Sequence, residues 1–522
     1  MPGRNYQHKS SLSLFLRVQS VCTGAIYQGY TLTEMLFTGN YILSKYGFDI
    51  FNMSESDKPQ TEQSRLMTIL IGPILCIAGM ITTYFTPHYT KKLERRQCMM
   101  ISDIFFLIAT VFTQLPAWEL FMVARLLMGV SCGIDLMVTP LYIREVSPDN
   151  MAAKTGSLFQ ANIFVGVIAG FLMSIPIQDF VSNDQTIGND WRWVFILPAV
   201  FSIQRLISLL IFFKEDTPYY YYKNRQFEKG RKALEQIYQQ RFVKKYEQQL
   251  LGPGSVDVPE IKQLNQTEER GSATSEDSSV NERLKLITNE QENSYHNRLR
   301  VGLVVNLCQQ MSGCTAMIGL SPNLIGLITD DYETKKCMIL GTYLFLFFVA
   351  TLGVGFNRKL ARKKYLVGGF LLCAVFQVAL AIISHFTDNL SSNTTLQFVF
   401  LMFLFFFYAS YNFTVGPVTV ILTSDILKDR GFSYSIMMNW VGVFLSIMLL
   451  INPQQYINNI IYGGFAFIGF LFSLKYVVET KWLNFNDIQD LYQDIEHNLH
   501  ESFYAKQNKE NESNLKQHLI EN

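Results

Sequence analysis

Four side-chain amides stand in otherwise apolar stretches and are the residues best suited to bind a neutral polar ligand. They are Gln160, Gln309, Gln310 and Asn439, and Trp440 follows the last of them. An amide donates and accepts hydrogen bonds, as sugar hydroxyls do, and an indole offers a flat face to the C–H side of a sugar ring. A fixed charge there would add a desolvation cost that a neutral ligand cannot offset. These residues predict a reversible site for a sugar-like ligand; the alternative is that each amide only bonds a neighbouring helix.

The elements that must position these amides are membrane-spanning helices. Hydrophobic residues make up 49% of the 522 residues and charged residues 17%, and the charges cluster between apolar runs. A helix that crosses a bilayer needs about 20 mostly apolar residues. Twelve such spans are predicted near residues 14–37, 66–86, 98–115, 118–142, 156–178, 193–213, 299–321, 338–356, 365–386, 397–424, 433–452 and 457–478. The sequence therefore predicts an all-α protein embedded in a lipid bilayer.

Polar stretches divide these spans into two groups of six. The expected segments are a cytoplasmic N-terminus over 1–13, a six-helix bundle over 14–213, a central loop over 214–297, a second six-helix bundle over 298–478 and a tail over 479–522. The central loop contains a helix-like run at 226–250. Apolar residues recur at helical spacing from Phe485 to Leu499 in the tail, which indicates an amphipathic helix that packs on the bundle. The alternative for the loop and the tail is a binding site for a cytoplasmic partner.

Loop charges predict the orientation in the membrane. The basic runs 91–96 and 358–363 and the basic central loop fall on one side, whereas the loops on the other side are acidic or neutral. Because basic loops remain in the cytoplasm, both termini are expected there. The glycosylation sequons at Asn52, Asn389 and Asn393 then fall on the outer side.

Several functional classes are not indicated. The net charge is +1, so no nucleic-acid partner is expected. The eight cysteines lie mostly inside apolar runs, which is typical of small buried residues and not of a metal site or a disulfide framework. No phosphate-binding loop or nucleophile motif is present, so neither a cofactor nor an enzymatic activity is expected.

One stretch, Ala124 to Gln160, has many residues at fixed spacings. Its pattern is R-x3-G-x3-G-x6-P-x-Y-x2-E-x2-P-x11-Q, in which Gly129 and Gly133 leave a groove for the close approach of another helix. The stretch resembles the fourth and fifth helices of the sugar porter family of the major facilitator superfamily. Further motifs that resemble the family are Q-Q-M-S-G at 309–313, N-W at 439–440 and V-E-T-K at 478–481.

This resemblance implies the major facilitator fold, with 12 transmembrane helices in two six-helix halves, and transport of a monosaccharide by alternating access. It places sugar contacts at Gln160, Gln309, Gln310, Asn439 and Trp440, and puts Thr315 where the family commonly has an asparagine. The family's gate aromatics are replaced by Gly319 and Leu320, and its tryptophan in the tenth span by Val420. A hexose such as glucose is the leading expectation, with pentoses and polyols as alternatives.

The resemblance also addresses energy coupling. Proton-driven members carry an aspartate at the position of Thr31, which does not titrate, so passive facilitated diffusion is expected. The alternative is proton symport that uses Glu34 or Asp135, since an acid inside a membrane span is a functional candidate. Either could pair with Arg125, although ten residues at a rise of about 1.5 Å argue against direct contact between Arg125 and Asp135.

Gating contacts are expected at the cytoplasmic helix ends. The resemblance assigns this role to Arg125, Glu145, Asp425, Arg430 and Glu479. An alternative of another class is a sugar sensor that binds without transporting, using its long loop and tail for signalling. The plasma membrane is the favoured location, and an internal membrane is the alternative.

Overall fold

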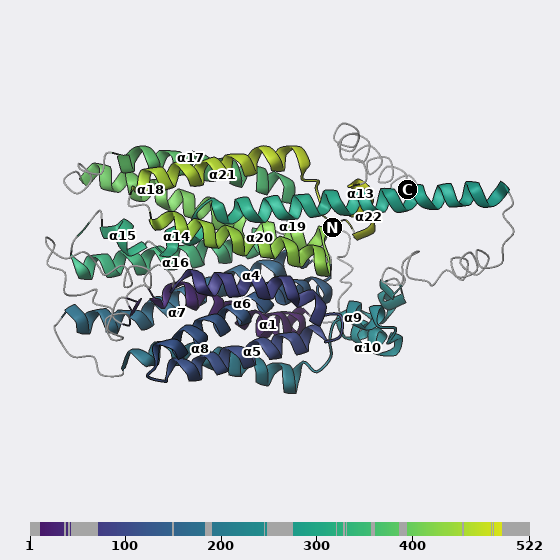
Figure 1. Ribbon diagram of the computed structural model, residues 1–522, viewed down its shortest axis with the longest axis horizontal. Helices are drawn as coiled ribbons and strands as arrows, with labels where there is room; N and C mark the ends of the chain where they lie inside the picture. The colour runs from purple at the N-terminus through teal and green to yellow at the C-terminus, as the bar shows by residue number, and fades with distance from the viewer. Residues whose placement is uncertain are drawn as a thin grey trace, which may run out of the picture.

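The computed structural model describes residues 11–35, 38–39, 42, 71–148, 151–182, 190–244, 246–247, 275–319, 321–326, 329, 331–356, 361–385, 394–451, 454–481, 483 and 485–492. Nearly all of these residues are helical. Two helical bundles lie side by side, the one built from the first half of the chain below the one built from the second half in Figure 1.

The first bundle contains six long helices. They are α1 (Ser11–Thr33), α4 (Pro73–Tyr89), α5 (Arg95–Thr113), α6 (Trp118–Val146), α7 (Ala152–Ser182) and α8 (Trp193–Ile207), with the short turns η1 (Asp190–Arg192) before α8 and η2 (Ser208–Phe212) after it. The short helices α9 (Pro218–Lys223) and α10 (Phe227–Ile237) follow, and α10 confirms the first part of the helix-like run predicted at 226–250.

The second bundle begins with α13 (Ser275–Met311). Its other elements are α14 (Cys314–Gly319), α15 (Ser321–Gly326), α16 (Tyr332–Phe356), α17 (Arg362–His385), α18 (Thr394–Ser410), η4 (Tyr411–Val415), α19 (Gly416–Ile426), α20 (Asp429–Met448), η5 (Leu449–Ile451), α21 (Gln455–Tyr476) and α22 (Phe485–Leu491). Within the described residues, α13 runs without a break through the boundary predicted at 297/298, so this boundary is not a break between elements.

Among the described residues, ten helices are long and apolar enough to cross a membrane. They correspond to the predicted third to twelfth spans, the tenth being formed by α18, η4 and α19 together. The helix α4 has 17 residues and is too short to be counted among these ten, and α1 is not apolar enough. Both still pack within the first bundle, α1 on α7 and α4 on α6, so twelve spans remain a prediction.

The paired glycines of α6 bring α4 very close. A Cβ atom on Gly129 would lie 2.4 Å from the carbonyl oxygen of Leu75, and one on Gly133 would lie 2.7 Å from that of Gly79. No larger residue fits at either position without moving the backbone of α4. The groove predicted from the four-residue spacing is therefore confirmed.

The helix that carries Gly416 changes its winding just before Pro417. Residues 411–415 form a π turn, and the amide of Gly416 donates to the carbonyl oxygen of Tyr411, five residues earlier. Proline lacks an amide hydrogen and its ring crowds the preceding turn, which disturbs the regular hydrogen-bond pattern. The wider turn is where Tyr411 and Asn412 enter the interior of the protein.

The described part of the tail packs on the second bundle, as its apolar spacing predicts. Ile488 and Tyr492 are buried. Ser294 donates to the carbonyl oxygen of Gln489 at 2.6 Å, and Asn297 donates to that of Tyr492 at 3.0 Å. The continuation of the tail from residue 493 lies outside the described residues.

All eight cysteines are free thiols. Seven are buried, and Cys337, in the second turn of α16, is exposed.

Candidate functional site

A cavity of about 190 Å³ lies at the interface between the two bundles. Its lining comes from α1, α4, α6 and α7 of the first bundle and from α13, α14, η4, α19 and α20 of the second. All six residues predicted to contact a sugar line this one cavity. They are Gln160, Gln309, Gln310, Thr315, Asn439 and Trp440.

The polar groups of the second bundle are bonded to one another. Asn439 Nδ2 donates to Gln309 Oε1 at 2.8 Å, and Gln310 Nε2 donates to Asn439 Oδ1 at 3.1 Å. The hydroxyl of Thr315 donates to Gln310 Oε1 at 2.7 Å, and Gln309 Nε2 donates to the carbonyl oxygen of Gly416 at 3.0 Å. Each amide therefore has a fixed orientation before any ligand arrives, which lowers the entropic cost of binding.

Four other cavity-lining residues have buried polar atoms without a described hydrogen-bond partner. These atoms are Gln28 Oε1, Arg125 Nε, Asn412 Oδ1 and Trp440 Nε1. Such atoms are costly unless water or a ligand satisfies them. Gln28 and Asn412 were missed by the sequence analysis, although the rule that found Gln160, an amide within an apolar run, applies to them equally.

The cavity also contains one member of a buried ion pair. Arg125 lines the cavity, and its Nη1 atom donates to Glu34 Oε1. The side chains are 2% and 0% exposed. Glu34 thus does not face the outer water, and the predicted option that it pairs with Arg125 is confirmed.

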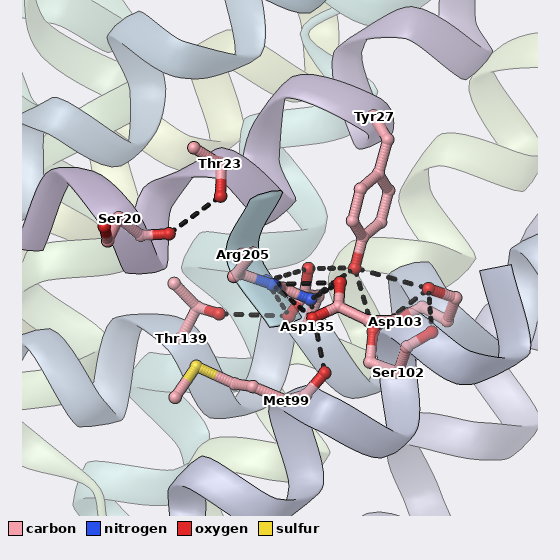
Figure 2. A network of polar contacts seen from close by, with 10 residues as sticks. Ser20, Thr23, Tyr27, Met99, Ser102, Asp103, Asp135, Thr139 and Arg205 are labelled. Atoms are coloured by element: carbon pink, nitrogen blue, oxygen red, sulfur yellow. Dashed lines mark hydrogen bonds and ion pairs between the residues drawn. The ribbon is translucent and has the colours of Figure 1, made fainter. Parts of the chain in front are cut away.

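Asp135 is paired with a different arginine. Arg205 Nη1 lies 2.8 Å from both carboxylate oxygens of Asp135, and Asp103 contacts the same guanidinium (Figure 2). The spacing argument against direct contact between Asp135 and Arg125 is confirmed. Arg205 and Asp103 were missed, although each is a charge within a predicted span.

Ion pairs join the bundles where α6 ends and α5 begins, which is the predicted cytoplasmic end. Arg144 of α6 contacts Asp425 of α19 at 2.8 Å, and Arg95 of α5 contacts Asp429 at 2.5 Å. Arg95 also contacts Glu145 at 3.1 Å.

Another acid at the same end, Glu479, caps a helix. It accepts hydrogen bonds from the backbone amides of Arg362 at 2.9 Å and Lys363 at 3.1 Å, at the start of α17. The side chain of Arg362 contacts Asp425 at 3.1 Å. Glu479 thus acts on the ionic contacts through the position of Arg362.

Two of the residues predicted to form the gate do not take part in these ion pairs. Arg125 precedes Glu145 by twenty residues on one continuous helix, about 30 Å along its axis, so it lies at the opposite end from these contacts. Its assignment to the cytoplasmic end was wrong. Arg430 is exposed, and within the described part of the chain it forms no ion pair.

The predicted glycosylation sequons at Asn52, Asn389 and Asn393 lie outside the described residues. Within the described residues, no group of three or more histidine, cysteine or acidic side chains could hold a metal ion.

The family model for sugar (and other) transporters matches residues 18–492. Hexose transporter 1 of Plasmodium vivax (strain Brazil I) is 25% identical over 484 residues, which cover 89% of each chain. The galactose-proton symporter of Escherichia coli (strain K12) is 23% identical and covers 76% of this chain and 80% of its own length. The facilitated glucose transporter member 2 of Sus scrofa is 24% identical, with coverage of 87% and 82%.

Among solved structures, the proton:xylose symporter XylE bound to 6-bromo-6-deoxy-D-glucose matches with a TM-score of 0.74. It is 16% identical, and the match covers 92% of this chain and all of the other. This likeness shows the fold. The chain therefore belongs to the sugar porter family of the major facilitator superfamily and is an integral, multi-pass membrane protein of sugar transport.

Proposed function

We propose that the protein carries a monosaccharide, with a hexose as the leading substrate, across the membrane by alternating access. The observation that carries this proposal is the cavity between the bundles, in which oriented amides face an indole and unpartnered polar atoms. A sugar offers donors and acceptors to each of these groups. The hexose, galactose and glucose transporters among the relatives support the choice of substrate.

Gln160 binds the sugar from the first bundle, and Gln309, Gln310, Asn439 and Trp440 bind it from the second. Thr315 acts by orienting Gln310. The ligand leaves chemically unchanged, because the site supplies binding groups and the relatives are transporters. Because the cavity is shared by both bundles, rocking one bundle against the other exposes it to either side of the membrane.

The ion pairs Arg144–Asp425 and Arg95–Asp429 serve as the cytoplasmic gate in this proposal. Each pair joins one bundle to the other, so opening that end requires both to separate. Arg362 and Glu479 position Asp425 and the start of α17. Both termini, the central loop and the tail lie in the cytoplasm, with the plasma membrane as the favoured location.

Passive facilitated diffusion is the favoured mode. Thr31 lines the cavity and donates its hydroxyl to the carbonyl oxygen of Gln28 at 2.8 Å. A threonine cannot carry a proton in exchange for sugar movement. The sugar gradient alone then drives transport.

A second candidate is proton symport through Glu34, which the buried ion pair with Arg125 favours. Arg125 touches the cavity, so a proton that neutralised Glu34 would free the guanidinium beside the sugar. Binding of sugar and proton would be coupled through that change of charge.

The test is uptake of labelled glucose by liposomes that contain the purified protein, with and without an imposed proton gradient. Gln160→Ala and Gln309→Ala are expected to reduce uptake at least tenfold, since each removes hydrogen bonds to the ligand. The matched control is Gln377→Ala. Gln377 is also a buried amide that donates to a backbone carbonyl, at 2.9 Å from Ser312, but it does not line the cavity.

Uptake that ignores the proton gradient supports the passive mode. Accumulation above equilibrium that is abolished by Glu34→Gln would establish symport instead. If no sugar of a panel of hexoses, pentoses and polyols moves, yet glucose raises the melting temperature of wild type and not of Gln309→Ala, the protein is a sensor and not a carrier.

A further inference from the structure

A second polar cluster lies inside the first bundle, separate from the sugar cavity (Figure 2). It is formed by Arg205 of α8, Asp103 of α5, Asp135 of α6 and Tyr27 of α1, and all four side chains are 0% exposed. None of the four lines the cavity. The cluster therefore ties four helices of one bundle together without access to solvent.

The formal charges of this cluster do not cancel. Arg205 contributes one positive charge, and two carboxylates contact its guanidinium, Asp103 at 2.7 Å and Asp135 at 2.8 Å. Among the described residues, the other titratable groups are Tyr27 in the cluster and Cys22 and Cys132 beside it, which are neutral when protonated. With both acids ionised, the cluster would hold one uncompensated negative charge in the membrane interior.

The other buried ion pair of this bundle does not compensate the extra negative charge of the cluster. Glu34 is paired with Arg125, so these two charges compensate each other. An unpaired buried charge is so costly that a group able to take up a proton does so. One of the two acids is therefore expected to be protonated.

The hydrogen bonds distinguish the two acids. Asp135 accepts from Arg205 with both oxygens, from the hydroxyl of Tyr27 and from that of Thr139 at 3.1 Å, so it is surrounded by donors. Among the described residues, Asp103 accepts hydrogen bonds from Arg205 alone: its Oδ1 accepts from Nη2 at 2.7 Å and from Nε at 3.0 Å, while Oδ2 shares that Nε hydrogen at 3.0 Å. Donors stabilise the ionised form, so Asp135 is the carboxylate and Oδ2 of Asp103 is the free position.

We propose that Asp103 holds a proton that stays on the protein throughout the transport cycle. The backbone of α1 packs directly against the cluster. A Cβ atom on Gly24 would lie 1.8 Å from Arg205 Nη1 and 2.1 Å from Asp135 Oδ2. All four helices belong to one bundle, so rocking between bundles does not break the cluster. The proton is thus a permanent part of the fold and is not exchanged with each sugar.

The proposal is tested by infrared difference spectra between the purified wild type and Asp103→Asn, recorded at neutral pH. A protonated Asp103 predicts that the variant loses a carboxylic acid band and no carboxylate band. Asp135→Asn is the matched comparison: Arg205 then contacts a single acid, so Asp103 is expected to ionise, and the carboxylate band should change position while the acid band disappears. Loss of carboxylate bands in Asp103→Asn would overturn the proposal.

Glucose uptake and the pH dependence of the melting temperature distinguish a proton that stays on Asp103 from one that moves with the sugar. Asp103→Asn is expected to retain the wild-type rate of glucose uptake with and without a proton gradient. Its melting temperature should fall less steeply than that of wild type as pH rises, because the folded wild type holds a proton that the unfolded chain releases. Gradient-dependent uptake that disappears in Asp103→Asn would make the site part of coupling.

Failure of Asp103→Asn to fold would also contradict the proposal. An amide has the charge and shape of a neutral carboxylic acid: its oxygen accepts from Nη2 and Nε of Arg205 as Oδ1 does, and only the hydrogen bond that Oδ2 shares with Nε is lost. This loss is small, so unfolding would point to the loss of an essential negative charge. This test does not depend on which sugar is carried.

Discussion

The two bundles repeat each other closely at the predicted cytoplasmic end. Asp216 accepts from the amide of Arg95 at 2.7 Å at the start of α5, and Glu479 accepts from the amide of Arg362 at 2.9 Å at the start of α17. In each bundle the capped arginine then contacts an acid on a neighbouring helix, Glu145 or Asp425. Arg95 and Arg362, one from each of the basic runs 91–96 and 358–363, thus occupy equivalent places.

Inside the membrane the bundles differ. The first buries two clusters of charged residues, Arg125 with Glu34 and Arg205 with two aspartates. The buried polar side chains described in the second bundle are amides and hydroxyls, apart from Arg298 within α13 and Asp425 at the end of α19. In the proposed function, most of the sugar-binding amides therefore belong to the second bundle, whereas the charged groups buried in the membrane belong to the first.

The largest expected effect comes from removing the central cation of the first bundle. Arg205→Ala leaves buried carboxyl groups without a cation, which costs about 3–5 kcal/mol and should prevent recovery of folded protein. Gln377→Ala in the second bundle removes a neutral hydrogen bond and should cost only about 1–3 kcal/mol. Melting temperature and elution as a single species measure both. Equal losses of stability in Arg205→Ala and Gln377→Ala would contradict the contrast between a charged interior in the first bundle and a neutral one in the second.

A smaller effect is expected from adding one methyl group beside the same cation. Gly24→Ala pushes into Arg205 and should lower the stability by about 1–3 kcal/mol, as overpacking does. Gly464→Ala, on α21 of the second bundle, meets no atom within 4 Å and should be neutral or raise the stability by less than about 1 kcal/mol. Thermal unfolding in detergent compares the two variants. A Gly24→Ala protein as stable as wild type would mean that Arg205 is not held tightly.

The energetic coupling between two sugar-binding residues should be larger within the second bundle than between the two bundles. Gln309 and Asn439 share a hydrogen bond at 2.8 Å, so the losses of glucose affinity in Gln309→Ala and Asn439→Ala should be non-additive by about 0.5–2 kcal/mol. Gln160 lies on the other bundle, and its loss should add to that of Gln309. A double-mutant cycle of glucose affinity measures both terms. Additive losses for the first pair would show that the amides act independently.

The smallest expected effect concerns the cap of α5. Burial raises the pKa of Asp216 from its ordinary value of 3.8 to about 7. The folded protein then holds a proton that the unfolded chain has already lost, so this contribution to stability is present at low pH and disappears as pH rises through about 7. Asp216→Asn should flatten that part of the profile of melting temperature against pH. Lys223→Gln is the control, since it breaks the nearby contact with Asp429 and leaves Asp216 intact; a flattening in both variants would contradict the assignment.

The six predicted cavity residues could be found because each stood in or beside a motif whose spacing fixes its place on a helix, whereas Gln28 and Asn412 were missed. The ionic contacts could be predicted only in part. Arg125 was assigned to the wrong end, although its position near the start of α6 already placed it far from Glu145. The pairing of Arg205 with Asp103 joins residues that are 102 positions apart, and no local pattern in one sequence reveals such a contact.

Helix boundaries were harder to predict where a helix extends into a polar stretch or changes its winding. The helix α13 begins in a polar stretch, so hydropathy places its start more than twenty residues too late. The turn of residues 411–415 depends on the geometry before Pro417, which a hydropathy profile does not contain.

The distribution of thiols gives the protein a built-in marker of orientation. Cys337 is the one exposed cysteine of the eight, and it lies near the end of α16 that is predicted to face outward. A membrane-impermeant maleimide should thus attach one label per molecule in intact cells, and none when Cys337→Ser is expressed. The same native residue can carry a fluorophore, so the direction in which each molecule inserts can be counted without engineering a cysteine.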